Sequence, residues 1–321
     1  MTDTQTLTFN NNALFLELCG PHDTHLLRIE SKLKVQLLPR GNTITLKGPE
    51  GARGEAAAAL ETLYARLEQG LPLSTAEVDA ALRIGNAPKG KVATTNQTLT
   101  LPRRTITPRS VAQGQYLTQM AANELVFGVG PAGTGKTYLA VAHAAQSLLK
   151  GEVERLILSR PAVEAGERIG FLPGDMKEKV DPYLRPLYDA LYDVMHTDYV
   201  DRRIAAGEIE IAPLAFMRGR TLSRAVVILD EAQNATVAQM KMFLTRLGEG
   251  SRMVVTGDPS QTDLPHPNDS GLADALGLLK NIEGVAATRF TRDDVVRHRL
   301  VKAIVGAYDA RAAKRSGSGG V

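Results

Sequence analysis

The stretch Gly130-Pro-Ala-Gly-Thr-Gly-Lys-Thr137 fits the phosphate-binding loop pattern G-x-x-x-x-G-K-[ST]. An apolar run of strand length, LVFGV at 125–129, comes directly before it. The segment 138–150, YLAVAHAAQSLLK, is rich in Ala and Leu and is typical of a helix. A strand, a glycine loop and a helix in this order aim backbone N–H groups and a helix N-terminus at a phosphate chain. The sequence therefore predicts a nucleotide phosphate site here.

Each part of this loop has an expected task. The glycines allow a tight turn and a close approach of the backbone to the phosphates. Lys136 is expected to reach the β- and γ-phosphates, and the Thr137 hydroxyl to hold Mg²⁺. The residues predicted to contact the nucleotide are Gly130, Pro131, Ala132, Gly133, Thr134, Gly135, Lys136, Thr137 and Tyr138.

A second apolar run, AVVIL at 225–229, ends in two acids, Asp230 and Glu231. Ligands of open parallel sheets bind at the carboxyl ends of the strands. Asp230 is expected there to hold Mg²⁺ through its water shell, and Glu231 to act as a general base on an attacking water. The alternative is that both acids cap a helix predicted over 235–247, because acids favour helix N-termini.

A third apolar run, at 252–256, ends in Gly257-Asp-Pro-Ser-Gln261. At the same sheet edge, Asp258 or Gln261 is expected to contact the γ-phosphate or the attacking water. The alternative is an ordinary turn, for which Gly, Asp, Pro and Ser are the usual residues.

Alternating strand and helix patterns predict an α/β fold, a parallel sheet with helices on both faces, over 111–312. The expected strands are 125–129, 155–159, 209–212, 225–229, 252–256 and 286–290. Residues 1–84 are predicted to form a small α+β unit, 85–110 a linker with an extended piece at 97–101, and 313–321 a flexible tail. In the α+β unit, strands are expected at 14–18, 33–38 and 43–47, and helices at 25–31, 54–68 and 74–83.

Composition excludes several classes of protein. In 321 residues, no apolar run reaches the roughly 18 residues that span a bilayer, and no signal peptide is recognised at the N-terminus. Cys19 is the only cysteine, which excludes a disulfide framework and a cysteine metal cluster. We interpret Cys19 as a small core residue, with a catalytic role as the alternative. These features predict a cytoplasmic protein without membrane contact.

The net charge is only +3, but the positive residues are unevenly placed. Between Asp79 and Glu124 there is no acidic residue. One interpretation is a solvated linker, and the other is contact with nucleic acid phosphates. The basic residues of this interval are Arg83, Lys89, Lys91, Arg103, Arg104 and Arg109.

The three motifs together resemble the PhoH family of ATPases, which is related to the first RecA-like half of superfamily 1 helicases. Four further segments carry the resemblance, which covers about 105–310. They are Ser159-Arg-Pro-Ala-Val-Glu164, Gly166-Glu-Arg-Ile-Gly-Phe-Leu-Pro-Gly174, Asp263-Leu-Pro and Val295-Val-Arg-His298. The resemblance implies a RecA-like P-loop domain, ATP and Mg²⁺ as cofactors, hydrolysis of ATP and a homo-hexameric ring.

Charge that develops on the γ-phosphoryl group usually needs an arginine, which a neighbouring subunit sometimes supplies. Arg297 ranks first, because Val295-Val-Arg-His298 resembles the arginine motif of helicases; the other candidates are Arg160, Arg246 and Arg299. For the adenine base, the Gln115 amide is expected to hydrogen-bond the edge of the base, and the Tyr116 ring is expected to stack on its face.

The N-terminal unit resembles the degenerate KH-like domain of bacterial PhoH-like proteins. Leu18-Cys-Gly-Pro-His-Asp-Thr-His-Leu26 stands where a KH domain has its GXXG clamp, followed by Arg40-Gly-Asn-Thr43. Gly20 is present, but Asp23 replaces the second glycine, and a carboxylate repels the phosphates that such a loop clamps. Both RNA binding and protein contact therefore stay open for this unit.

These features favour an RNA-linked ATPase, and the resemblance suggests a YbeY-type endoribonuclease of ribosomal RNA processing as partner. ATP is favoured over GTP, because no guanine-reading Asn-Lys-x-Asp signature is present. The alternatives are a kinase or phosphotransferase, an assembly factor that acts without RNA, and a non-enzymatic nucleotide-binding scaffold.

Overall fold

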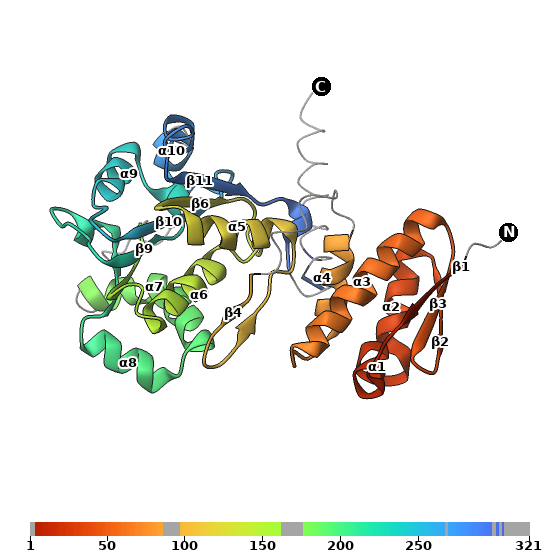
Figure 1. The fold of residues 1–321 in the computed structure, drawn as a ribbon. Coiled ribbons are helices and arrows are strands. Elements are labelled where there is room, and N and C mark those ends of the chain that lie inside the picture. The colour runs from red at the N-terminus through yellow and green to blue at the C-terminus, as the bar shows by residue number, and fades with distance from the viewer. Residues whose placement is uncertain are drawn as a thin grey trace, which may run out of the picture.

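The computed structural model describes residues 4–85, 97–161, 176–266, 269–296, 300, 301 and 304. A small N-terminal unit lies beside a larger unit built on a six-stranded sheet (Figure 1). Among the described residues, no helix is both long and apolar enough to pass through a membrane.

The N-terminal unit is the expected α+β structure, with helices packed on a three-stranded antiparallel sheet of order β1-β3-β2. Its buried core includes Phe15, Leu18, Ile29, Ile44 and Leu60. In chain order its elements are β1 (Thr4–Thr8), α1 (Asn12–Cys19), α2 (Thr24–Leu33), β2 (Gln36–Arg40), β3 (Thr43–Lys47), α3 (Glu50–Glu68) and α4 (Thr75–Gly85).

The strand predicted at 14–18 is wrong, because this stretch lies in α1. The side chain of Asn11 accepts hydrogen bonds from the backbone N–H groups of Ala13 and Leu14, which caps the helix. Helical spacing then buries Phe15 and Leu18 on one face. A short apolar run does not distinguish a strand from a buried helix, so the cap decides here.

The larger unit contains the six predicted strands in one parallel sheet, of order β11-β6-β10-β9-β7-β8. The strands are β6 (Leu125–Val129), β7 (Arg155–Arg160), β8 (Ile209–Pro213), β9 (Ala225–Leu229), β10 (Arg252–Gly257) and β11 (Val285–Arg289). The described helices of this unit are α5 (Val111–Ala122), α6 (Lys136–Leu149), α7 (Met176–Val194), α8 (Thr197–Ala205), α9 (Val237–Leu244) and α10 (Gly271–Leu278).

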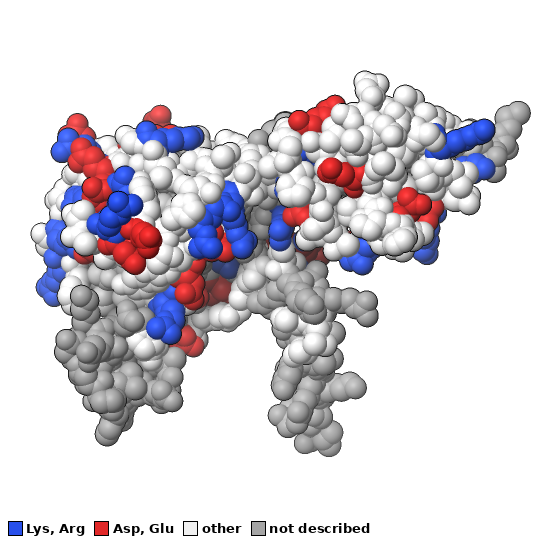
Figure 2. Space-filling view, turned by 90° about the horizontal axis from the view of Figure 1, so that it is seen from below, with Lys and Arg blue, Asp and Glu red and all other residues white. Residues whose placement is uncertain are grey.

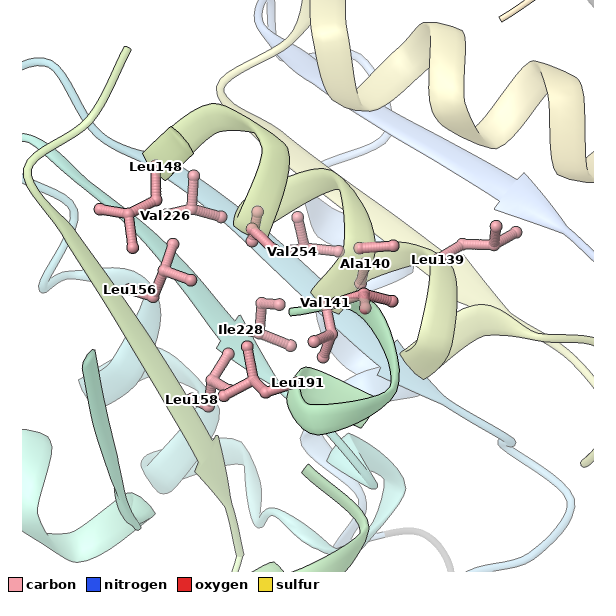
Figure 3. Packing of buried hydrophobic residues seen from close by; sticks show 14 of the residues in the cluster. Leu139, Ala140, Val141, Leu148, Leu156, Leu158, Leu191, Val226, Ile228 and Val254 are labelled. Atoms are coloured by element: carbon pink, nitrogen blue, oxygen red, sulfur yellow. The ribbon is translucent and has the colours of Figure 1, made fainter. Parts of the chain in front are cut away.

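Alternate residues of each central strand enter different cores, as the pleat of a sheet requires. Val226 and Ile228 of β9 pack with α6 and α7 on one face (Figure 3). Val227 and Leu229 of the same strand pack with α9 and α10 on the other. The sheet is thus covered on both faces, and the carboxyl ends of its strands form one edge.

The second half of the predicted linker packs on the larger unit. β4 (Leu99–Thr100) and β5 (Thr105–Ile106) form a small antiparallel hairpin. Leu99, Leu101 and Ile106 are buried in the core that contains α6. Residues 86–96 and the tail 313–321 lie outside the described residues.

Candidate nucleotide site

The loop between β6 and α6 has a backbone that only glycine tolerates at its first position. Gly130 has a φ of 141°, and a Cβ atom there would lie 2.4 Å from the carbonyl oxygen of Phe290. Gly135, with a φ of 85°, is left-handed and stands at the N-cap of α6. These two positions turn the chain from the strand into the helix, as a phosphate-binding loop requires.

Lys136 closes over the loop from the first turn of α6. Its Nζ donates hydrogen bonds to the carbonyl oxygens of Gly130 and Pro131, at 2.6 and 2.8 Å. The side chain is buried, which strengthens its interaction with any charge that approaches. The loop carbonyl groups therefore hold the positively charged Lys136 ammonium group at the loop.

Thr137 and Asp230 meet, although they are 93 positions apart in the chain. The Thr137 hydroxyl donates to Asp230 Oδ1 at 2.6 Å, and Thr256 of β10 donates to the same oxygen, also at 2.6 Å. A hydroxyl and one carboxylate beside a phosphate loop suit Mg²⁺, which is usually held by few protein oxygens together with substrate phosphates. The residues present therefore fit the metal expected from the sequence.

Arg160, at the end of β7, lies on the other oxygen of the same carboxylate. Its Nε and Nη2 donate to Asp230 Oδ2 at 2.7 and 2.5 Å, and its Nη1 donates to the carbonyl oxygen of Tyr183 at 3.0 Å. The side chains of Arg160 and Asp230 are 16% and 2% exposed. Of the two arginine candidates that the structure describes, Arg160 and Arg246, Arg160 is the one that contacts the carboxylate at the predicted metal site.

Glu231 follows Asp230 with a left-handed backbone, φ 53°, and its side chain is 48% exposed. It does not cap α9, whose N-cap is Thr236 in a capping box with Gln239. The alternative that Asp230 and Glu231 serve as caps of that helix is therefore wrong.

Gln233 belongs to this site, although no role for it is predicted from the sequence. Its Nε2 donates to Glu231 Oε2 at 2.6 Å, and its Oε1 accepts from the backbone N–H of Asp258 at 3.0 Å. It thus joins the loops after β9 and β10. In the sequence, the role of Gln233 is indicated only by its position in the Asp230-Glu-Ala-Gln motif.

Asp258 and Gln261 lie at the expected sheet edge, and they also form a turn. The backbone N–H of Ser260 donates to Asp258 Oδ1 at 3.0 Å, and Gln261 Nε2 donates to Asp258 Oδ2 at 2.8 Å. Both oxygens of the Asp258 carboxylate therefore accept hydrogen bonds from residues of the same turn. Gln233 links this turn to Glu231, because it hydrogen-bonds both the Asp258 backbone and the Glu231 side chain.

The glutamine that contacts the loop is Gln113. The prediction that Gln115 and Tyr116 bind the adenine base is wrong. Gln113 Nε2 donates to the Thr134 carbonyl oxygen at 2.9 Å. Gln115 is exposed, because two residues along a helix turn a side chain to the opposite side. The Tyr116 ring is fully buried against Phe290 in an edge-on contact, so it has no free face for a base.

Comparison with known proteins identifies the family at this point. Residues 105–309 match the family described as PhoH-like protein. The chain belongs to the PhoH-like family. It is 49% identical over 300 residues to a PhoH-like protein of Bacillus subtilis, covering 92% of this chain and 93% of that one. It is 48% identical over 299 residues to a PhoH-like protein of Mycobacterium tuberculosis (92% and 85% covered), and 48% identical over 205 residues to Protein PhoH of Escherichia coli (63% and 58% covered).

Among solved structures, a Pif1 helicase from Candida albicans covers 56% of this chain and 39% of its own, at 16% identity and a TM-score of 0.30. A TM-score of this size does not establish a common fold. The family and the loop geometry together make the larger unit a PhoH-like P-loop nucleotide-binding domain.

A cavity of about 370 Å³ opens beside this P-loop. Tyr138 lies in its wall and donates a hydrogen bond to Asp193 Oδ2 at 2.8 Å. Burial and this carboxylate raise the pKa of Tyr138 to about 12, so the phenol stays protonated at neutral pH. The other lining residues are Arg66, Glu77, Arg104, Thr105, Ile106, Thr107, Arg109, Gln113, Gly133, Gly135, Leu139, Asp193 and Val296.

Among the described residues, the other arginine candidate is Arg246, and its hydrogen bonds do not reach the loop. Arg246 donates to the carbonyl oxygens of Met242 and Arg220, at 3.0 and 2.9 Å, and so links the end of α9 to the segment before β9. Arg297 and Arg299 lie outside the described residues.

The predicted basic interval is partly engaged within the protein. Arg103 donates to the carbonyl oxygen of Tyr192, and Arg104 pairs with Asp193 at 2.8 Å. Arg109 pairs with Glu77 at 3.1 Å. On the face seen in Figure 2, blue and red side chains are interspersed rather than gathered into one patch. Lys89 and Lys91 lie outside the described residues.

The segment between α1 and α2 has the sharp turn expected of a clamp loop. Gly20, His22 and Asp23 all have a positive φ, of 76°, 52° and 56°. Asp23 is exposed, so its carboxylate stands in solvent on this loop. The negative charge of Asp23 at this position is expected to repel RNA phosphates from the loop.

Proposed function

We propose that this PhoH-like chain hydrolyses ATP with Mg²⁺ and couples hydrolysis to RNA binding, remodelling or processing. The observation that carries the hydrolytic part is the contact between Thr137 and Asp230, 2.6 Å between Oγ1 and Oδ1. It joins the first turn of α6 to the end of β9 and places a hydroxyl and a carboxylate beside Lys136. These are the groups that P-loop hydrolases need around a metal-bound triphosphate.

Each group then has a role in the reaction. Lys136 compensates charge on the β- and γ-phosphates. Thr137 and Asp230 would hold Mg²⁺, which would neutralise charge on the oxygens of the same phosphates. Glu231 takes a proton from the attacking water. Its hydrogen bond from Gln233, 2.6 Å, fixes Oε2, and we assign the water to Oε1, which lies 3.9 Å from Arg160 Nη2.

The cavity beside the loop suits the nucleoside. Thr137 and Asp230 would hold Mg²⁺ near the β- and γ-phosphates, so these two residues would mark that end of the triphosphate. Gly133, Gly135 and Tyr138 border the cavity at the other end. Gln113 lies between loop and cavity with an amide that suits adenine, and the sequence has no guanine-reading Asn-Lys-x-Asp signature, so we propose ATP over GTP.

The coupling to RNA is supported by the acid-free interval from Arg83 to Arg109 and by the KH-like resemblance of the N-terminal unit. The PhoH resemblance further suggests a ring of six copies and a YbeY-type endoribonuclease partner. A kinase or phosphotransferase, and an ATP-driven assembly factor without RNA, are the competing functions.

The test is phosphate release from ATP with RNA, with DNA and with no polymer. Hydrolysis that RNA accelerates supports the whole proposal. Hydrolysis that no polymer changes leaves an ATPase with another partner, and absence of release without an added acceptor favours a phosphotransferase.

Two variants and a control make this test specific to the site. Lys136→Ala is expected to abolish hydrolysis, because the γ-phosphate loses its charge partner. Glu231→Gln should bind ATP like the parent but turn over on the order of 10²-fold more slowly, as expected for loss of a general base. Glu249→Gln, an exposed glutamate away from the loop, should match the parent. Parent-like hydrolysis by Lys136→Ala would disprove the site.

A further inference from the structure

Three consecutive hydrogen bonds connect the N-terminal unit to the P-loop. Glu77 of α4 accepts a hydrogen bond from Arg109 Nη2 at 3.1 Å. The backbone N–H of Arg109 donates to Gln113 Oε1 at 2.7 Å, and Gln113 Nε2 donates to the Thr134 carbonyl oxygen at 2.9 Å. Because each bond uses a different atom of its residue, all three exist at once.

Arg66 of α3 adds a second link between the two units. Its Nη1 donates to Thr107 Oγ1 at 2.6 Å. Burial lowers the pKa of Arg66, while the charges of Glu77 and Arg109 act on it in opposite directions. Two guanidinium groups and one carboxylate therefore meet where the units touch.

These charged residues line the cavity that we assign to the nucleoside. Arg66 and Glu77 belong to the N-terminal unit, yet they border the same 370 Å³ space as Gly133, Gly135 and Tyr138. A cavity of this volume is in the usual range for small-molecule sites. A nucleoside that extends from the loop, away from Thr137 and Asp230, therefore enters a space whose far wall is the N-terminal unit.

We propose that the N-terminal unit completes the nucleotide site. Glu77 positions Arg109 and, through the Arg109 backbone, Gln113, whereas Arg66 positions Thr107 in the wall of the same cavity. This inference rests on the proposed function, because it assumes that the loop binds ATP. Binding linkage is reciprocal, so ATP in turn strengthens the docking of α4 on the larger unit. The N-terminal unit thereby senses whether the nucleotide site is filled.

The first experiment compares two ligands on the full chain, ATP and inorganic tripolyphosphate. In Glu77→Ala and in Arg66→Ala, ATP should bind about tenfold more weakly, a usual size for coupling between sites, whereas tripolyphosphate affinity stays at the parent value. A merely structural loss would weaken both ligands together. The charge exchange Glu77→Arg with Arg109→Glu should regain part of the ATP affinity that each single change loses.

Asp79→Asn is the matched control. Asp79 lies on the same helix as Glu77, but it pairs with Arg28 of α2 inside the N-terminal unit, at 2.7 Å. This variant should bind ATP like the parent. An equal loss of affinity in Asp79→Asn and Glu77→Ala would overturn the proposal, because general destabilisation of α4 would then explain both.

Hydrogen exchange of the α4 amides in the full chain supplies an independent readout. A non-hydrolysable ATP analogue should slow exchange in the parent and not in Glu77→Ala. If the parent binds the analogue and α4 exchange is unchanged, the inference fails while the ATPase proposal stands. If the parent binds no ATP at all, the proposed function itself is wrong.

Discussion

Arg160 and Asp230 form a two-pronged ion pair in which Nε and Nη2 both lie on Oδ2, at 2.7 and 2.5 Å. Thr137 and Thr256 donate to Oδ1 of the same carboxylate. The orientation of the metal-side carboxylate is therefore fixed by groups from β7, β10 and α6. In the proposed reaction, this carboxylate would need little reorientation when Mg²⁺ and nucleotide bind.

Arg160→Ala should destabilise the larger unit by about 3 kcal/mol, because it leaves a buried carboxylate without its cation. Arg160→Lys should recover part of this stability, since a lysine restores the charge without the planar pair of donors. Urea unfolding measures both. Arg220→Ala, which breaks the more exposed pair with Glu210, is the control and should cost at most about 1 kcal/mol. Equal stability of Arg160→Ala and the parent would show that the pair contributes nothing.

Gln233 should affect turnover more than nucleotide binding, because it contacts the proposed base and no group of the P-loop among the described hydrogen bonds. In Gln233→Ala we expect turnover to fall on the order of tenfold, with ATP affinity unchanged, as for a residue that positions a general base. Gln233→Glu should be slower still, since it places a second carboxylate against Glu231. Single-turnover hydrolysis and nucleotide titration separate the two quantities, and parent-like turnover in both variants would leave Gln233 without a role.

The strands and the loop could be predicted because their signals are local. The run at 225–229 is apolar at every position, as a strand buried on both faces must be, and the loop pattern fixes its own geometry. The strand prediction at 14–18 is wrong because five apolar-rich residues fit either structure, and only the cap at Asn11 distinguishes the two.

The contacts within the site depend on strand order, which a single sequence does not reveal. Arg160 reaches Asp230 because β7 lies next to β9, although the residues are 70 positions apart. Which of Gln113 and Gln115 faces the loop depends on the rotation of α5 about its axis. Two positions along a helix turn a side chain to roughly the opposite side, and a single sequence does not fix that rotation.

His143 should make the stability of the larger unit depend on pH. It is buried on α6, and burial, followed by the charge of Arg252, lowers its pKa from 6.5 to about 4. Between these values the unfolded chain binds the proton and the folded chain does not, so stability falls as pH drops below 6.5. Urea unfolding at about pH 7.5 and about pH 5 should differ by about 2 kcal/mol from this group. His143→Gln should reduce that difference, and an undiminished difference would assign it to other groups.

Arg297→Ala should slow hydrolysis with little effect on ATP affinity, as expected of a group that stabilises the transition state. If the chain forms the ring that its family resemblance implies, and if the arginine acts on a neighbouring subunit, excess Glu231→Gln chains mixed into that ring should partly restore turnover. In such rings some interfaces pair an intact Arg297 with an intact Glu231. No restoration in mixed rings that are verified by mass measurement would contradict action across an interface.

The basic interval gives the prediction that bears on RNA. Arg103 and Arg104 contact Tyr192 and Asp193, and Arg104 lines the cavity beside the loop. Changing them together with the lysines to Ala should weaken RNA binding, but it should also disturb the nucleotide site. Lys89→Ala with Lys91→Ala is therefore the sharper variant.

If the lysines bind RNA phosphates, the double variant should bind RNA more weakly, and its log–log salt slope should fall by roughly 0.7 for each phosphate that is no longer neutralised. ATP affinity should match the parent, because the P-loop begins at Gly130, beyond this interval of the chain. Lys150→Ala, an exposed lysine at the end of α6, controls for the loss of positive charge elsewhere. Unchanged affinity and slope in the double variant would make the interval a linker only. The RNA-facing surface would then have to lie on the N-terminal unit, or the RNA proposal would be given up for a protein partner.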